Sequence, residues 1–219
     1  MAGLFPALLK VEGRLCVIVG GGEVALRKAV TLVGRGARVK VISPVLAPEL
    51  ARLAEGGVLE WERGPYRPGA LAGAFLCVAA ADDPSVNRAV RDEAGELKVL
   101  VNVVDDPEGS DFQVPSFFEE GPLLVALSTS GESPAAARTL RRMIQAYLGP
   151  HFGEALSRIG RFREQRVKPA LASARLRGGF WEQAVTPELL ELVRSGELSE
   201  MMNRLEESLS RFKAREADE

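Results

Sequence analysis

The feature that most constrains the fold is a short apolar run that ends in three consecutive glycines. Residues 15–19 read Leu-Cys-Val-Ile-Val, which is typical of a strand buried on both faces of a parallel sheet. Gly20, Gly21 and Gly22 follow directly, and residues 23–34 space their apolar side chains as a helix does. The sequence therefore predicts a strand, a tight turn and a helix, the opening unit of a dinucleotide-binding sheet.

Strand and helix signals continue to alternate through the first half of the chain. Apolar runs that indicate strands lie at 38–42, 59–62, 74–80 and 99–104, and helical segments lie between them at 49–55 and 82–97. Alternation with short connections is typical of helices packed on a parallel sheet. We predict an α/β fold with a Rossmann-like, doubly wound parallel sheet over residues 1–112.

The pattern changes after Pro107. Residues 112–118 and 123–128 predict two strands joined by a turn, a hairpin that lies outside the first sheet. Ser133 and Pro134 then begin a helix with a hydroxyl cap and a first-turn proline. We therefore expect a hairpin and helix region over 113–149 and a helical C-terminal domain over 150–219.

Composition excludes several classes of protein. The net charge of −2 provides no global positive field for nucleic acid or an anionic membrane. No secretory leader or membrane-spanning segment is predicted, so we expect a cytoplasmic protein. Cys16 and Cys77 lie in apolar runs and are expected in the core. His151 is the only histidine, and no metal-binding motif is present, so no metal site of the protein is predicted.

The glycine run fits the dinucleotide fingerprint. Gly20 would make the turn, Gly22 would let the pyrophosphate approach the backbone, and Ala25 would take the third small position. Gly21 lies between them, and the N-terminus of the following helix favours the anion. The alternative is a glycine turn that serves packing alone.

The residue that normally binds the adenine ribose differs from the usual one. A carboxylate is expected at the end of the second strand, but Ser43, Pro44 and Val45 stand there. Ser43 is a candidate hydrogen-bond partner of the ribose, and Arg38 or Lys40 are candidate partners of a 2′-phosphate. These residues leave the choice between NAD and NADP open.

Two acidic pairs follow strands. Asp105 stands at the carboxyl end of a buried strand, where ligands of open α/β sheets bind, and is a candidate general base. The alternative is that Asp105, Asp106 and Pro107 form only a polar turn. We interpret Asp82 and Asp83 as the cap of the next helix.

A hydroxyl-rich loop precedes the helix that begins at Pro134. Residues 128–133 read Ser-Thr-Ser-Gly-Glu-Ser and offer donors that suit substrate carboxylates, with Ser128 and Ser130 as candidates. Arg138 is a further candidate on the helix. For this arginine, as for its neighbours, the alternative is a solvated charged face.

These motifs together resemble the precorrin-2 dehydrogenase and sirohydrochlorin ferrochelatase family. The resemblance rests on residues 20–28, the strand end Asn-Val-Val-Asp at 102–105 and the run LSTSGESPAAARTLR at 127–141, and it extends over 5–182. It covers the N-terminal half of bacterial sirohaem synthase and the stand-alone yeast-type enzyme. Ala81 departs from the family, which commonly has threonine there.

The resemblance implies a site and an assembly. NAD would be the oxidant, with Asp105 as the catalytic aspartate and Ser128 at the edge of the pocket. An intertwined homodimer would form through residues 113–149, and the tetrapyrrole would bind in a cleft between the parts of the chain. The positions that match the family's cofactor contacts are Glu23, Val24, Pro44 and Val45.

The implied reaction is NAD-dependent oxidation of precorrin-2 to sirohydrochlorin, for sirohaem or cobalamin. Some members of the family also insert Fe²⁺ or Co²⁺ into sirohydrochlorin. Two alternatives remain: a chelatase without redox activity, and a non-catalytic NAD-binding regulator whose C-terminal helices bind a partner. Metal insertion without NAD would favour the first, and NAD binding without turnover would favour the second.

Overall fold

The structure is a computed structural model that describes residues 3–218. It divides into two compact units, one up to Val114 and the other from Pro115 onward. Of the helices in the described part of the chain, none has the length and apolar character needed to cross a bilayer.

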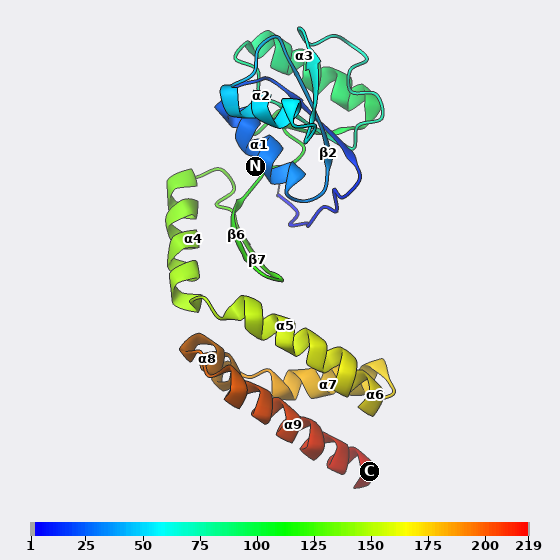
Figure 1. The fold of residues 1–219 in the computed structure, drawn as a ribbon, viewed down its shortest axis with the longest axis vertical. Coiled ribbons are helices and arrows are strands. Elements are labelled where there is room, and N and C mark those ends of the chain that lie inside the picture. Colours follow the sequence, from blue (N-terminus) through cyan, green and yellow to red (C-terminus); the bar gives the residue numbers. More distant parts are fainter. Residues whose placement is uncertain (1–2, 219) are drawn as a thin grey trace. The chain divides into compact units, whose positions relative to one another are not determined.

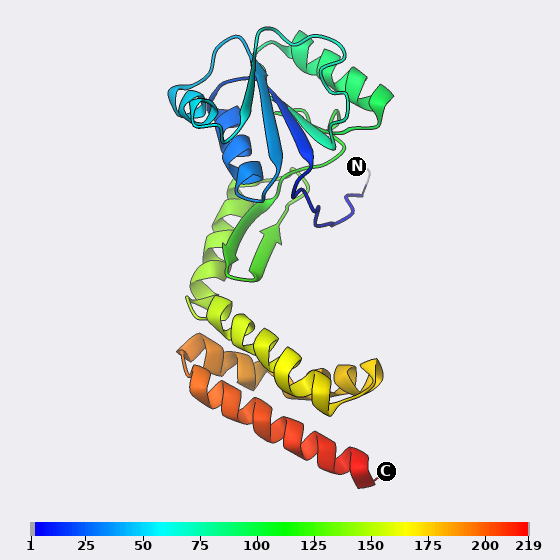
Figure 2. The ribbon, with the colours of Figure 1, turned by 45° about the vertical axis from the view of Figure 1, so that its right-hand side comes forward.

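The first unit contains the predicted parallel sheet. Its strands run in the order β3-β2-β1-β4-β5, and every neighbouring pair is parallel. Helices α1 and α2 cover one face and α3 covers the other (Figures 1 and 2). The doubly wound α/β prediction is confirmed. The bounds are β1 (Leu15–Val19), α1 (Glu23–Val33), β2 (Arg38–Ser43), α2 (Pro48–Glu55), β3 (Glu60–Arg63), β4 (Leu76–Ala79), α3 (Pro84–Leu97) and β5 (Leu100–Val103).

Alternating side chains of β1 enter both cores of this unit. Cys16 and Ile18 pack with α1 and α2, whereas Val17 and Val19 pack on the face covered by α3. Burial on both faces explains the continuous apolar run in the sequence. Cys16 and Cys77 are fully buried, as predicted, and burial raises the pKa of the Cys16 thiol to about 11 and that of Cys77 to about 12.

The outer edge of β5 is covered by the chain that leaves the sheet. The Asp111 amide donates to the Val101 carbonyl at 2.8 Å, and the Asp111 carboxylate accepts from the Val101 amide at 3.0 Å. The Ser110 hydroxyl accepts from the Val103 amide at 2.9 Å. Phe112 is held in the same way, because its carbonyl accepts from the Asn102 side chain at 3.1 Å. The prediction that a strand begins at 112 is therefore wrong.

The second unit begins with the predicted hairpin, which forms a separate antiparallel sheet of two strands. Seven helical segments follow in the described part of the chain, one of them a π-helical turn that the sequence did not indicate. Pi-helical turns are rare and short. The bounds are β6 (Ser116–Glu120), β7 (Leu123–Leu127), α4 (Pro134–Leu148), α5 (Phe152–Phe162), η1 (Arg163–Val167), α6 (Lys168–Ala170), α7 (Ala174–Ala184), α8 (Pro187–Ser195) and α9 (Leu198–Asp218).

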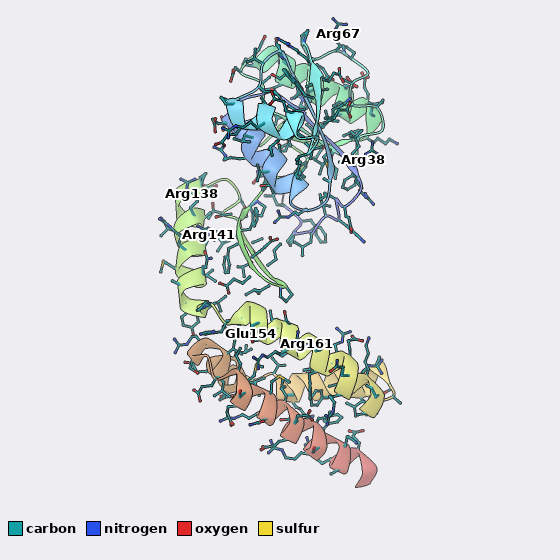
Figure 3. The ribbon with its side chains drawn as sticks, viewed as in Figure 1. Arg38, Arg67, Arg138, Arg141, Glu154 and Arg161 are labelled. Atoms are coloured by element: carbon teal, nitrogen blue, oxygen red, sulfur yellow. The ribbon has the colours of Figure 1, made fainter. Side chains whose placement is uncertain are left out.

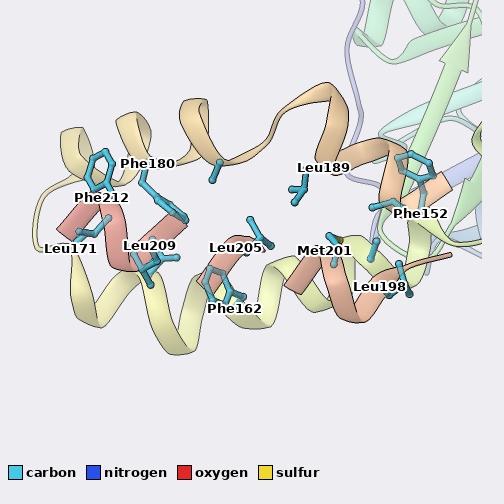
Figure 4. Packing of buried hydrophobic residues seen from close by; sticks show 14 residues of the cluster. Phe152, Phe162, Leu171, Phe180, Leu189, Leu198, Met201, Leu205, Leu209 and Phe212 are labelled. Atoms are coloured by element: carbon cyan, nitrogen blue, oxygen red, sulfur yellow. The ribbon is translucent and has the colours of Figure 1, made fainter. Parts of the chain in front are cut away.

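The C-terminal helices of this unit share a core of their own. Phe162, Phe180 and Phe212 are almost fully buried together with Met201 and Leu205. Figure 4 shows these side chains directed into the space between α5, α7 and α9. Rings of Phe180 and Phe212 meet edge to face, with centroids 5.9 Å apart. The helical C-terminal region is thus a packed body rather than a set of separate helices.

Candidate functional site

The carboxyl edge of the first sheet carries the glycine turn, and its first two glycines have no room for a side chain. Gly20 has a φ of +127°, and a Cβ atom there would lie 2.2 Å from the Ala80 carbonyl oxygen. A Cβ atom on Gly21 would lie 2.0 Å from the Val45 carbonyl oxygen. Both neighbours are backbone atoms that cannot rotate away. The turn therefore requires glycine at both positions for the packing of the fold itself.

Gly22 has a different environment. No atom lies within 4 Å of a Cβ built on it, so its open side faces free space. It is the N-cap of α1 and makes no side-chain cap hydrogen bond, which leaves the first-turn amides of α1 available. These amides and the helix dipole suit an anion such as a pyrophosphate. The residues present therefore fit a dinucleotide.

A cavity of about 480 Å³ lies at this turn, and we call it the glycine pocket. Val45 is 73% exposed and Pro44 is exposed, so both can contact a ligand. Six of the predicted cofactor contacts line this pocket: Gly21, Gly22, Glu23, Ser43, Pro44 and Val45. Leu46, Ala47 and Asp82 complete its lining.

Ser43 is placed beneath the turn. It is 7% exposed, and its hydroxyl donates to the Val45 carbonyl at 2.7 Å. A Cβ atom on Gly21 would also lie 2.6 Å from this hydroxyl. Ser43 thus stabilises the turn by donating its hydroxyl proton to the backbone. A hydrogen bond to the ribose stays a prediction.

The structure corrects the suggestion that Arg38 or Lys40 reaches a 2′-phosphate. Arg38 begins β2, at the end of the strand opposite Ser43. Lys40 lies in mid-strand, and its ammonium donates to Glu62 at 3.2 Å and to the Ala70 carbonyl at 3.3 Å. The basic side chain that does end a strand at this edge is Arg63, the register partner of Ser43 on β3.

A second cavity, of about 560 Å³, lies over the ends of β4 and β5, and we call it the aspartate pocket. Asp82 lines both this pocket and the glycine pocket. Val24, one residue after Glu23 of the glycine pocket, lines it as well. The two pockets are therefore adjacent on one edge. Its lining residues are Val24, Ala80, Ala81, Asp82, Pro84, Asn87, Arg88, Arg91, Val103, Val104, Asp105 and Asp106.

Asp105 and Asp106 divide two tasks between them. The Asp106 carboxylate accepts from the Gly109 amide at 2.9 Å, and its carbonyl accepts from the Ser110 hydroxyl at 2.7 Å, so Asp106 builds the turn. Asp105 has a φ of +58°, an unusual backbone conformation that aspartate tolerates. Its exposed carboxylate makes no hydrogen bond or ion pair within the described residues. Asp106 thus builds the polar turn, and the role of Asp105 as a general base stays a prediction.

Asn87 fixes the loop between β4 and α3. Its side-chain oxygen accepts from the Ala81 amide at 3.0 Å, and its side-chain nitrogen donates to the Ala81 carbonyl at 2.9 Å. These two bonds fix the backbone of Ala81, the position at which the family commonly has threonine. Because Ala80 also packs against Gly20, the clamp fixes a loop that borders both pockets.

Asp83 caps α3, as the sequence predicted. Its carboxylate accepts from the Ser85 amide at 2.8 Å. Hydrogen bonds from Ser85 lower the pKa of the Asp83 carboxyl below its usual value. The cap sets where α3 begins, and so where its first two turns meet the pocket.

Sequence reasoning missed three polar residues of α3 that line the aspartate pocket: Asn87, Arg88 and Arg91. With Pro84, they repeat at helical spacing along one face of the helix. That spacing was visible in the sequence, but a polar helical face is normally solvated. Only the position of β5 beside α3 distinguishes a pocket wall from a solvent face.

The predicted substrate residues Ser128, Ser130 and Arg138 belong to the second unit. The Ser128 hydroxyl accepts from the Ser130 amide at 3.1 Å, and Ser130 has a φ of +53°. Arg138 lies on α4 together with Arg141, which donates to Gln145 at 3.0 Å (Figure 3). Their role toward a substrate stays a prediction. Within the described residues, no group of three or more His, Cys, Asp or Glu side chains is placed to hold a metal ion.

The sheet order, the glycine turn and the open N-terminus of α1 define a dinucleotide-binding domain of the Rossmann class. Residues 7–116 match the family described as "Putative NAD(P)-binding", and residues 151–209 match the sirohaem synthase dimerisation region. The chain therefore belongs to this NAD(P)-binding family, and its C-terminal part is similar to the sirohaem synthase dimerisation region.

Similar proteins agree with this assignment. The chain is 41% identical over 204 residues to siroheme synthase of Photorhabdus laumondii, covering 93% of this chain and 43% of the relative. It is 42% identical over 193 residues to siroheme synthase of Chromobacterium violaceum, covering 88% of this chain and 41% of the relative. The chain thus spans about two fifths of the length of these curated relatives.

A solved structure has the same fold. The protein titled SirC, precorrin-2 dehydrogenase, matches with a TM-score of 0.72 at 21% identity, over 93% of this chain and 100% of that chain. The resemblance inferred from the motifs is confirmed by these matches. At this identity the structural likeness supports the fold alone.

Proposed function

We propose that this protein oxidises precorrin-2 to sirohydrochlorin with NAD as the oxidant. The names of the relatives and of the structural neighbour support the substrate class. One observation carries the proposal for this chain: the unpaired Asp105 carboxylate lines a cavity that adjoins the glycine pocket through Asp82. A proton acceptor therefore lies beside the place where a dinucleotide fits.

The glycine pocket would hold NAD through the backbone. The amides at the start of α1 would bind the pyrophosphate beside Gly22, and Pro44 and Val45 would contact the adenosine side. Val24 would contact the nicotinamide side, because it lines the aspartate pocket. When bound, NAD supplies a hydride acceptor.

Asp105 would act as the general base. Conversion of precorrin-2 to sirohydrochlorin removes two electrons and two protons, as one hydride and one proton. The carboxylate of Asp105 is exposed and free of competing bonds, so it can accept that proton and pass it to water. The turn built by Asp106 and Ser110 fixes the backbone from which the Asp105 side chain extends.

The same carboxylate favours a second activity, insertion of Fe²⁺ or Co²⁺ into sirohydrochlorin. Metal insertion requires removal of the pyrrole N–H protons. Asp105 can accept them because its oxygens have no other partner in the described chain. In this proposal the metal ion is a substrate, and it needs no resident site.

The second unit would supply the dimer. The sirohaem synthase dimerisation region matches its C-terminal helices. Leu140, Met143 and Tyr147 lie on one face of α4 and are 43%, 61% and 67% exposed. An exposed apolar face of this kind fits a second copy of the chain. We propose a homodimer, with Ser128, Ser130 and Arg138 contributing to substrate binding.

Replacement of Asp105 tests the proposal. Asp105→Asn keeps the size of the side chain and removes the base, so we expect turnover of precorrin-2 to fall by about 10²- to 10⁴-fold with unchanged NAD affinity. Anaerobic incubation with precorrin-2 and NAD, followed by NADH and sirohydrochlorin absorbance, measures this. Glu108→Gln, three residues along the same turn, is the matched control. Full turnover by Asp105→Asn would overturn the role of this carboxylate.

A further inference from the structure

The aspartate pocket is lined by positive charges as well as by carboxylates. Arg88 and Arg91, three residues apart on α3, both line it. Residues three apart on a helix lie on one face, so the two guanidiniums face the same space. Both arginines belong to the same compact unit as Asp105.

Neither guanidinium is committed to a strong internal partner. Arg88 makes no hydrogen bond or salt bridge within the described residues, although its charge helps to lower the pKa of Asp83. Among the described residues Arg91 bonds only to the adjacent Asp92, at 3.1 Å, and 45% of its side chain and 65% of that of Asp92 are exposed. Exposed pairs of this kind contribute little and give way to a better partner. Both arginines are therefore available to an anionic ligand.

The charges are arranged in an order that a ligand can match. Asp82 and Asp105 follow the ends of β4 and β5, whereas both arginines come from α3, so the two kinds of charge enter the pocket from different elements. A tetrapyrrole has the complementary order, since its N–H groups are central and its carboxylates are on the rim. Arginine also suits carboxylates because it can donate two parallel hydrogen bonds.

We propose that Arg88 and Arg91 bind rim carboxylates of the substrate and give the site its preference for highly carboxylated tetrapyrroles. This inference rests on the proposed function for the identity of the substrate. Beyond the proposed function, it names the residues that would distinguish acetate-bearing tetrapyrroles from tetrapyrroles with fewer carboxylates. With the rim held at α3, the centre of the ring lies toward Asp105.

Porphyrin binding tests this assignment without any turnover. Uroporphyrin I carries an acetate and a propionate on each ring, whereas coproporphyrin I carries a methyl group in place of each acetate. Titration of the purified chain with each porphyrin, followed by fluorescence quenching, gives two dissociation constants. The variants are Arg88→Gln and Arg88→Gln/Arg91→Gln, with Arg52→Gln on α2 as the matched control, since Arg52 is exposed and lines neither pocket.

We expect loss of each arginine to weaken uroporphyrin binding about tenfold, with a smaller effect on coproporphyrin, so that the preference between the two shrinks. NADH affinity should be unchanged in every variant, which also shows that the sheet is folded. Arg88→Gln alone keeps the test valid if the double variant is unstable, because Arg91 also packs against Gly109.

The outcomes separate this inference from the proposed function. Equal uroporphyrin affinity in the wild type and the arginine variants would overturn the assignment, even if precorrin-2 were oxidised normally. Arginine-dependent preference for uroporphyrin without any oxidation of precorrin-2 would support the assignment and overturn the proposed dehydrogenase.

Discussion

The two pockets on the edge of the sheet are neighbours, but one is formed mainly by backbone atoms and the other mainly by side chains. The glycine pocket is shaped by backbone: two glycines that tolerate no side chain, the open N-terminus of α1 and a serine tied to a carbonyl. The aspartate pocket is shaped mainly by side chains of the loop after β4, of α3, and of the end of β5 with the turn that follows it. The glycine pocket depends on residues that leave no room for a larger side chain. The aspartate pocket depends on residues with charged or polar side chains.

The largest effect should come from the glycine turn. Gly21→Ala places a methyl group against the Val45 carbonyl, so we expect a loss of about 1–3 kcal/mol in unfolding free energy and little remaining NAD affinity. Gly22→Ala meets no atom and should melt like the wild type, yet it should weaken NAD binding about tenfold or more because its methyl occupies the anion's approach. Thermal melts and calorimetric titration with NAD measure both. Normal NAD binding by Gly21→Ala would contradict a backbone-built pocket.

An intermediate effect is expected at Asn87, whose clamp borders both pockets. Asn87→Leu removes two hydrogen bonds to Ala81 and should lower the unfolding free energy by about 1–3 kcal/mol. Because the loop also carries Asp82, we expect both the KM for NAD and kcat to change. Asn87→Asp keeps the bond from the Ala81 amide and should fall between wild type and Asn87→Leu. A change in stability without any kinetic change would show that the clamp does not position the site.

The smallest effect should come from the cap of α3, and it depends on pH. The pKa of Asp83 is lowered in the fold, so its contribution to stability is present above the unfolded value, about pH 4, and is lost as the pH falls through the folded pKa. Asp83→Ala should therefore melt slightly below the wild type at pH 7 and level with it near pH 2. Asp83→Asn keeps a capping oxygen that does not titrate, and its cap should not depend on pH. NAD affinity should stay constant, because Asp83 lines neither pocket.

The contrast between the pockets also explains what the sequence could reveal. The glycine pocket was predictable, because a triple glycine after a buried run reports a backbone requirement in the residue types themselves. Asp105 and Asp106 are identical residues side by side, and their roles separate only through the φ of +58° at Asp105 and the bond from Gly109 to Asp106. Arg88 and Arg91 had the spacing of an ordinary solvated face.

The errors in the secondary structure have a physical cause as well. The strand expected from residue 112 begins at Ser116, because the apolar Phe112 is bound to Asn102 of β5 instead of to the hairpin. Long-range pairing of this kind leaves no local pattern. Lys40 is likewise only a candidate phosphate partner in the sequence, where its partners in the fold, Glu62 and the Ala70 carbonyl, lie 22 and 30 residues away.

The tie between residues 110–112 and β5 also bears on where this domain can be separated from the rest of the chain. Asp111 and Ser110 occupy the amides of Val101 and Val103, which would otherwise form an open edge able to pair with a strand of another molecule. A fragment that ends at Val114 keeps this protection, whereas one that ends at Asp105 loses it. Residues 110–112 therefore protect the edge of β5 from pairing with another molecule, and their removal would expose the amides of Val101 and Val103.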